Sequence, residues 1–239
     1  MRIREVYSHM GTKLMEGGNI FPDVEPFAAR SAQGIFNTVQ KIMPQGVKLL
    51  SVGSAGHKAM SGDMDLMVDE RQVMEYFGSK DSKSARQSLK DYFIGKGLDS
   101  ALSGTNVHVK IASPEGFAQV DIMFVPNAGN ISQFHNHDYA NTKYSGANKH
   151  VVLASLAKYT QTTEHPQGFI WSAFQGLKDR ATKEIVTDDP TTVAQMLIAP
   201  DATAKDLRSI EAIIAKLPQD QYPKLKDAQE TLAKDGIQL

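Results

Sequence analysis

The first half of the chain alternates apolar and polar positions in a way that predicts several strands. The run 47–52 is mostly apolar and indicates a buried strand, and a second strand is expected over 63–68. Residues 106–111 and 117–125 alternate with period two, and the Ser-Pro-Glu-Gly turn at 113–116 between them predicts a hairpin. This half therefore has the pattern of a mixed sheet.

Helical periodicity surrounds these strands. A helix is predicted between Asp23 and Met43, with Asp23 as its cap and Pro26 at an early helical position. Its apolar residues Ile35, Val39, Ile42 and Met43 fall on one face, and Pro44 and Gly46 end it. Residues 70–95 are also expected to be helical.

Strand patterns are not recognised after residue 147, where the apolar spacing is helical. Thr203 and Asp206 have the spacing of a capping box that opens a helix ending at Pro218. A last helix is expected over 222–234, with Gly236 near its C-cap. The chain is therefore predicted to be α+β, with a mixed sheet and helices over 1–126 followed by a helical domain over 127–239.

Composition excludes several classes of function. The 239 residues include no cysteine, which excludes a disulfide framework, a thiolate metal site and a cysteine nucleophile. The N-terminus holds no apolar core of a signal peptide and no stretch is long enough to cross a membrane, so we expect a soluble cytoplasmic protein. With 26 basic and 27 acidic residues, the chain is not coated with cations for duplex binding.

The candidate chemistry lies between residues 51 and 69. Asp63 and Asp65 alternate along a predicted strand, so both carboxylates point to one face, roughly 6.6 Å apart. Carboxylates at this spacing can hold a pair of divalent ions about 3.5–4 Å apart, and oxygen ligands favour Mg²⁺ or Mn²⁺. Upstream, Gly53 allows close approach of a phosphate and Ser54 offers a hydroxyl and an amide at the start of a short helix or turn.

A third carboxylate, Asp121, stands inside the apolar strand 117–125. A charge in such a strand is costly unless it is paired or binds a metal, so a metal ligand and a structural ion pair are both open interpretations. His57 and Lys58 follow the Gly-Ser pair and add positive charge, although both are also typical of an exposed turn.

The ordered set of apolar strand, Gly53-Ser54, Asp63-Met64-Asp65 and Asp121 resembles the DNA polymerase beta-like nucleotidyltransferase superfamily. The segment from Gly53 to Leu66 looks most like compact members such as archaeal-type CCA-adding and oligoadenylate-synthase enzymes. A Gly-Gly-Asn segment at 17–19 is similar to one in bacteriophage nucleotidyltransferases. The resemblance implies a palm-like catalytic domain followed by a helical domain that binds nucleotide and substrate.

The resemblance also implies the reaction. A nucleoside triphosphate would bind with its phosphates near Gly53, Ser54 and Lys58, and two Mg²⁺ or Mn²⁺ ions would be held by Asp63, Asp65 and Asp121. A hydroxyl acceptor, either an RNA 3′ end or a small molecule, would attack the α-phosphorus and release pyrophosphate, and Asp121 would also be able to take its proton. From the helical half, Lys149 is the candidate for a triphosphate contact.

Other interpretations remain open at this point. A chain of this superfamily that has lost catalysis would be a nucleotide- or RNA-binding protein. The basic residues of 80–90 suit either a solvated helix face or an RNA contact, and Lys149 suits a helix surface. His135 and His137 indicate a polar loop more than a metal site, and Trp171 is expected in the core of the helical half.

Overall fold

A computed structural model describes residues 19–239 and divides them into two compact units, 19–132 and 133–239. The segment 1–18 lies outside the described residues. It includes the N-terminus, where no signal peptide is predicted, and the two glycines of the Gly-Gly-Asn segment. Within the described part, no helix is long and apolar enough to cross a membrane. The two units are described separately.

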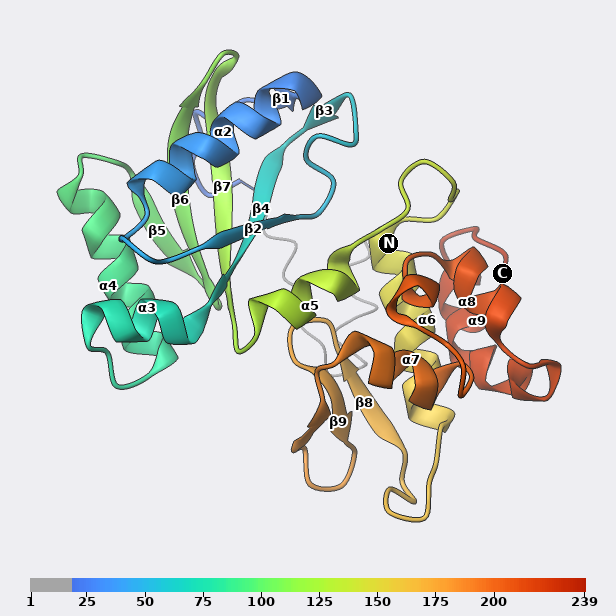
Figure 1. Cartoon of the computed structure of the whole chain (residues 1–239). Helices are drawn as coiled ribbons and strands as arrows, with labels where there is room; N and C mark the ends of the chain where they lie inside the picture. Colours follow the sequence, from blue (N-terminus) through green and yellow to red (C-terminus); the bar gives the residue numbers. More distant parts are fainter. Residues whose placement is uncertain (1–18) are drawn as a thin grey trace. The chain divides into compact units, whose positions relative to one another are not determined.

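The unit 19–132 is built on a five-stranded mixed sheet (Figure 1). The strands lie in the order β2-β4-β7-β6-β5, with β4 and β7 parallel and the other neighbours antiparallel. A separate two-stranded pair joins β1 and β3. The elements are β1 (Phe27–Ala28), α2 (Ala29–Ile42), β2 (Leu49–Val52), β3 (Met60–Ser61), β4 (Asp63–Asp69), α3 (Glu70–Phe77), α4 (Ser82–Gly95), β5 (Ser100–Ser103), β6 (Asn106–Ser113) and β7 (Gly116–Val125).

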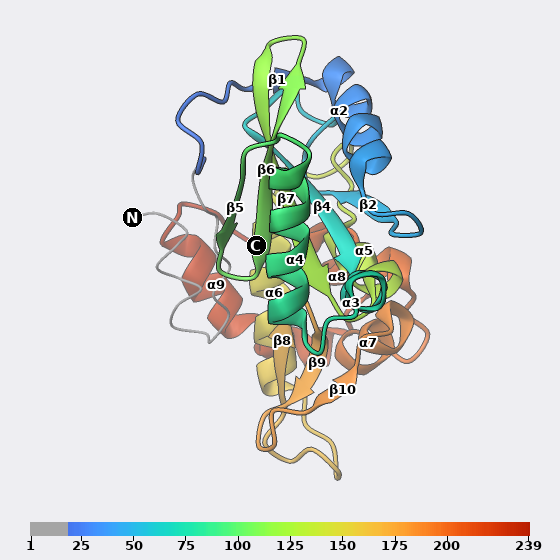
Figure 2. The same ribbon diagram turned by 90° about the vertical axis from the view of Figure 1, so that its left-hand side faces the viewer.

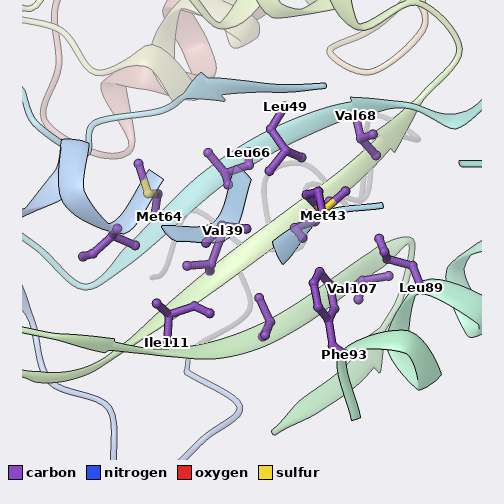
Figure 3. Packing of buried hydrophobic residues seen from close by; sticks show 14 of the residues in the cluster. Val39, Met43, Leu49, Met64, Leu66, Val68, Leu89, Phe93, Val107 and Ile111 are labelled. Atoms are coloured by element: carbon purple, nitrogen blue, oxygen red, sulfur yellow. The ribbon is translucent and has the colours of Figure 1, made fainter. Parts of the chain in front are cut away.

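Helices α2 and α4 pack on one face of this sheet (Figures 1 and 2). The alternate apolar positions of β4, β6 and β7 point to that face, as the period-two pattern requires, whereas Met67, Met123 and Val125 point to the other one. Figure 3 shows how side chains of α2, α4 and the strands meet there. The fully or almost fully buried members include Val39, Leu49, Met64, Leu66, Val68, Leu89, Phe93, Val107 and Ile111. The opposite face is therefore the one that receives the alternate, more polar positions.

The strand predictions for this unit are confirmed, and the hairpin β6–β7 closes with Ser113 opposite Gly116. Two helix predictions were partly wrong, the first at its start and the second in its middle. The first helix begins at Ala29, because β1 occupies the preceding residues, and Asp23 pairs with Lys110 instead of capping. The expected helix over 70–95 is two helices, since Gly78 adopts φ 61° at the end of α3 and a capping box opens α4.

The unit 133–239 contains strands as well as helices, so the prediction of a purely helical second half was wrong. A three-stranded antiparallel sheet runs in the order β10-β9-β8. The strands have four residues or fewer, too short to show a periodic pattern. The elements are α6 (Gly146–Tyr159), β8 (Phe169–Ser172), β9 (Gly176–Asp179), β10 (Ile185–Thr187), α7 (Pro190–Leu197), α8 (Ile210–Lys216) and α9 (Lys226–Ala233), with α5 (Ala128–His135) crossing the boundary between the units.

The two helices predicted near the end of the chain each begin with a 3-10 segment instead of an α-helix. Thr203 and Asp206 do form a capping box, but it opens a 3-10 turn over Ala204–Leu207. The α-helix begins later, where the Ser209 hydroxyl accepts from the backbone of Ala212. The helix expected over 222–234 is likewise a 3-10 segment over Gln219–Leu225 followed by α9. Trp171 is buried as expected, but on β8.

Candidate functional site

The three predicted carboxylates lie on the sheet face opposite α2 and α4. Asp63 and Asp65 alternate with the buried residues of β4, and Asp121 of β7 is the direct register partner of Asp65. Neighbouring strands are about 4.8 Å apart, so partners in register have adjacent side chains on the same face. Asp63 and Asp65 are half-buried, whereas Asp121 is buried. The parallel pairing of β4 and β7 therefore brings the predicted set together.

The turn after β2 is fitted closely to Asp65. Val52 is the register partner of Asp65, and Gly53 follows it with a φ of +74°. A β-carbon added to Gly53 would lie 2.5 Å from Oδ2 of Asp65. Glycine is thus required here for two reasons. The backbone is left-handed, and the Asp65 carboxylate occupies the space that a side chain would fill.

The segment after Gly53 is a single turn rather than a helix. The amides of His57 and Lys58 both donate to the carbonyl oxygen of Ser54, at 3.0 and 3.2 Å. The helix N-terminus that the sequence suggested as an anion site at Ser54 is therefore reduced to a turn. Ser54 is half-buried and Lys58 is exposed, so both remain at the surface of this turn.

A cavity of about 490 Å³ lies beside the same turn, on its other side. Met64 lines it, and Met64 points to the face opposite Asp63 and Asp65. The cavity is therefore not the space in front of the carboxylates. Its lining comes from α2, the end of β2 and the turn: Ala29, Ala32, Gln33, Phe36, Ser51, Ala55, Gly56, His57 and Met64.

Two residues at this site were missed by the sequence interpretation. His108 of β6 donates from Nδ1 to Oδ1 of Asp121 at 2.7 Å, and Gln119 donates from Nε2 to the same oxygen at 2.9 Å. The signal was present in the predicted hairpin, because a turn closing at Ser113 and Gly116 sets His108 opposite Asp121. The buried charge of Asp121 is thus hydrogen-bonded, as one of the two interpretations of the sequence required.

The three carboxylates share one face of the sheet, but their side chains do not form a ready cation site in the described residues. Among residues 19–239, no group of three or more His, Asp or Glu side chains is arranged to hold a metal ion. The donor chemistry nevertheless fits a hard divalent ion, since the side chains are carboxylates on one face. Because a β-carbon at position 53 would lie 2.5 Å from Oδ2 of Asp65, glycine at this position lets that oxygen lie close to the backbone of the turn.

Lys149 lies at the start of α6, as predicted, but its side chain is fully buried. Its ammonium nitrogen donates to the carbonyl oxygens of Phe134 and Asn136 at 2.8 and 2.7 Å. Burial lowers the pKa of Lys149 to about 7, and the charge of Arg208 contributes in the same direction. These contacts join α6 to the end of α5, and they do not favour the triphosphate contact, which stays a prediction.

Two histidines lie close to Lys149, of which His150 is buried and His135 is partly buried. Burial lowers the pKa of His135 to about 4, and it lowers the pKa of His150 well below its usual value. His135 interacts through Nε2 with the carbonyl oxygen of Ala173, and the Trp171 indole donates to Nδ1 of His150. His135 ends α5 and joins this cluster, whereas residues 136–138 form a loop at the surface, as the sequence suggested.

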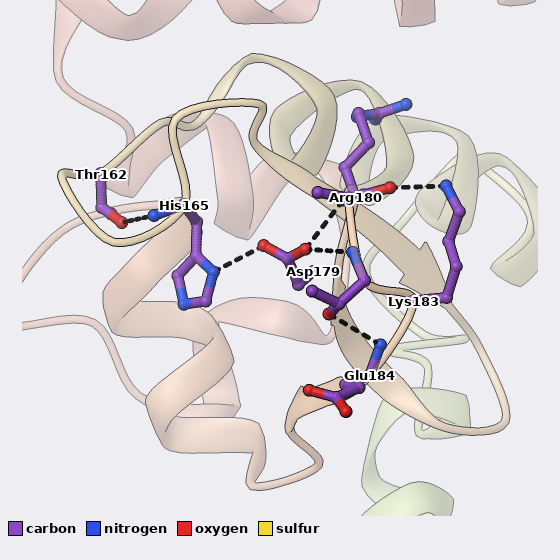
Figure 4. Close-up of polar contacts among 8 residues, drawn as sticks. Thr162, His165, Asp179, Arg180, Lys183 and Glu184 are labelled. Carbon is purple, nitrogen blue, oxygen red and sulfur yellow. Dashed lines mark hydrogen bonds and ion pairs between the residues drawn. The ribbon is translucent and has the colours of Figure 1, made fainter.

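A second His-Asp pair lies at the β9 end of the small sheet (Figure 4). His165 and Asp179 are 2.7 Å apart, and the backbone amides of Ala181 and Thr182 donate to the other oxygen of Asp179. The Thr182 amide and His165 lower the pKa of Asp179 to about 2. This cluster joins the loop before β8 to the turn after β9, at the open end of the β8–β9 hairpin.

Comparisons with known proteins assign no family. No protein-family model matches the sequence, and no curated protein is significantly similar to it. A solved cytoplasmic RNA terminal U-transferase is 14% identical with a TM-score of 0.31, over 72% of this chain and 50% of its own. The Cid1 poly(U) polymerase, solved with Mg and 3′-dATP, is 13% identical with a TM-score of 0.33, over 97% of this chain and 91% of its own. The chain thus spans half the length of the first of these proteins, and similarities this distant do not determine its function.

Proposed function

We propose that this protein is a metal-dependent nucleotidyltransferase. It would transfer a nucleoside monophosphate from a nucleoside triphosphate to a hydroxyl acceptor, an RNA 3′ end or a small molecule. The new bond joins the acceptor oxygen to the α-phosphorus, the bond to the β-phosphate oxygen breaks, and pyrophosphate and the hydroxyl proton leave. The observation that carries the proposal is the close fit of Gly53 against Asp65, with Asp121 in register beside it.

The residues divide into two groups in this proposal. Asp63 and Asp65 would hold the divalent cations, together with the oxygen of Asp121 that His108 and Gln119 do not occupy. When bound, Mg²⁺ or Mn²⁺ would neutralise the negative charge of the triphosphate and stabilise the attacking and leaving oxygens. The turn at Gly53 and Ser54 would contact the phosphates, where the absence of a side chain at Gly53 permits close approach, and Lys58 would add positive charge.

The alternative function is a nucleotide- or RNA-binding protein without catalysis. Two observations favour it: the carboxylates do not form a ready cation site in the described residues, and Asp121 is held by two hydrogen-bond donors. This alternative predicts binding of a nucleoside triphosphate or RNA with no release of pyrophosphate.

The test uses the full chain with Mg²⁺ or Mn²⁺, each α-labelled nucleoside triphosphate in turn, and RNA or small hydroxylated acceptors. We expect labelled product and pyrophosphate, and a loss of roughly 10²-fold or more in rate for Asp65→Asn, because this change removes a cation-binding charge. Asp91→Asn is the matched control, since Asp91 is an exposed carboxylate on α4 that contacts Gln87 and Lys90. Binding without pyrophosphate release would support the alternative, and equal rates for wild type and Asp65→Asn would contradict the proposal.

A further inference from the structure

We propose that His108 and Gln119 are positioning residues that fix the Asp121 carboxylate for the transfer reaction. This inference rests on the proposed function and deepens it. Both side chains donate to the same oxygen, Oδ1 of Asp121, and no other contact to the carboxylate is seen among residues 19–239. Oδ2 is thereby reserved for the cation and the acceptor hydroxyl.

The direction of the hydrogen bond between His108 and Asp121 follows from the chemistry of the two groups. An ionised carboxylate only accepts hydrogen bonds, so Nδ1 of His108 carries the hydrogen in the 2.7 Å contact. His108 is 3% exposed and Asp121 is 6% exposed, so water does not compete freely for this bond. A charge-assisted hydrogen bond in a buried site orients both groups more strongly than one at the surface.

The amide of Gln119 is oriented from its other end. Its Oε1 accepts a hydrogen bond from the backbone amide of Ile20 at 2.6 Å, which turns Nε2 toward Asp121. The side chain is fully buried and lies on the same face of β7 as Asp121, two residues away. Gln119 is therefore held as a donor and cannot rotate to present its oxygen without losing both contacts.

The backbone holds the two partners of the His-Asp contact in fixed register. His108 and Asp121 are directly opposite in the antiparallel hairpin β6–β7, and the carbonyl oxygen of His108 accepts from the Ser100 hydroxyl at 2.7 Å. Side chains opposite each other in such a pair are neighbours on one face. A site built on paired strands is positioned more precisely than one on a loop.

The other nitrogen of His108 shows that the ring is poorly suited to a purely structural role. Nε2 is buried and has no hydrogen-bond partner among residues 19–239. An unsatisfied buried polar atom costs about 1–3 kcal/mol, which an apolar residue of similar size would avoid. The contact between Nδ1 and Asp121 is therefore the feature that an imidazole provides here and a leucine does not.

The test measures cation affinity directly, by titrating Mn²⁺ and following free Mn²⁺ by electron paramagnetic resonance, and separately measures kcat and KM for transfer. We expect His108→Leu to weaken Mn²⁺ binding by ~10-fold or more, as is typical when a hydrogen-bond partner of a metal ligand is lost. His108→Asn should restore most of the affinity, because its side-chain amide can donate from near the position of Nδ1. Gln119→Met removes the second donor and should weaken Mn²⁺ binding in the same direction.

The control is His165→Leu, which breaks a His-Asp contact of the same 2.7 Å length in the other unit and should leave Mn²⁺ affinity unchanged. Wild-type affinity and kcat in both His108→Leu and Gln119→Met would overturn the inference while leaving the proposed function intact. A wild-type protein that binds no Mn²⁺ and transfers no nucleotide would overturn both. If His108→Leu does not fold, His108→Asn and Gln119→Met decide the question by the same measurements.

Discussion

Replacement of Gly53 by alanine should change the position of Asp65 and also strain the backbone of the turn. Comparison with a second glycine variant distinguishes the effect of each change on activity and on stability. The new β-carbon would lie 2.5 Å from Oδ2 of Asp65, 3.2 Å from its β-carbon and 3.3 Å from its carboxyl carbon. Contacts below 3.0 Å are essentially not seen for real β-carbons, so the carboxylate must move by at least about 0.5 Å. The backbone at φ +74° adds strain of about 1–2 kcal/mol for a residue with a side chain.

The matched control is Gly46→Ala. Gly46 has a φ of +87°, close to that of Gly53, but a β-carbon there has no atom within 4 Å. Both variants should therefore lose about 1–2 kcal/mol in the free energy of unfolding, which a domain of ordinary stability tolerates. Only Gly53→Ala displaces Asp65, and a misplacement approaching 1 Å can lower a catalysed rate by about 10²-fold.

The assay combines urea denaturation with kcat/KM for nucleotide transfer and Mn²⁺ affinity. We expect the two variants to unfold at similar urea concentrations, with Gly46→Ala active and Gly53→Ala slowed by about two orders of magnitude. The reasoning is refuted if Gly53→Ala retains wild-type kcat/KM and Mn²⁺ affinity. It is also refuted if both variants lose activity in proportion to their stability.

Two further predictions concern the buried cluster of the unit 133–239. The folded-state pKa of His135, about 4, lies below its usual 6.5, so the unfolded chain binds a proton that the folded chain does not and stability falls as pH drops from 6.5 toward 4. Urea denaturation at pH 7 and pH 5 should show a loss to which His135 contributes ~2 kcal/mol and to which His150 adds in the same direction. His135→Gln should reduce the loss by the share of His135, and an equal loss in this variant contradicts the assignment. For Lys149, with a folded-state pKa of about 7 against 10.5, stability should rise between pH 7.5 and 9.5 by about 2 kcal/mol. Lys149→Met should abolish this rise, and an unchanged slope would show that the lysine is not its source.

The sequence predicted the central strands because their pattern is local. Apolar residues recur with period two along β4 and β7, and this repeat alone indicates which side chains share a face: Met64, Leu66 and Val68 in the first strand, and Ala118, Val120, Ile122 and Phe124 in the second. It was enough to place Asp63 and Asp65 together and to put Asp121 on a strand. The Gly53-Ser54 pair was also recognised from its position directly after an apolar run.

Other features depended on segments that are distant along the chain. The strands β8 to β10 have four residues or fewer, so pairing with each other defines them and periodicity does not. Asp65 faces Asp121 only because β4 and β7 pair in parallel across a long connection. The burial of Lys149 follows from the carbonyl groups at the end of α5, which no local pattern reveals.

The sequence by itself therefore determined which residue types stand on which strands, including the three carboxylates and the glycine before them. The tertiary structure decided what each of those residues touches. It turned Asp121 toward His108 and Gln119, fitted Gly53 against Asp65, and buried Lys149. The physical reason is that a side-chain period is set within one strand or helix, whereas hydrogen bonds and close packing are made between elements whose register only the folded chain fixes.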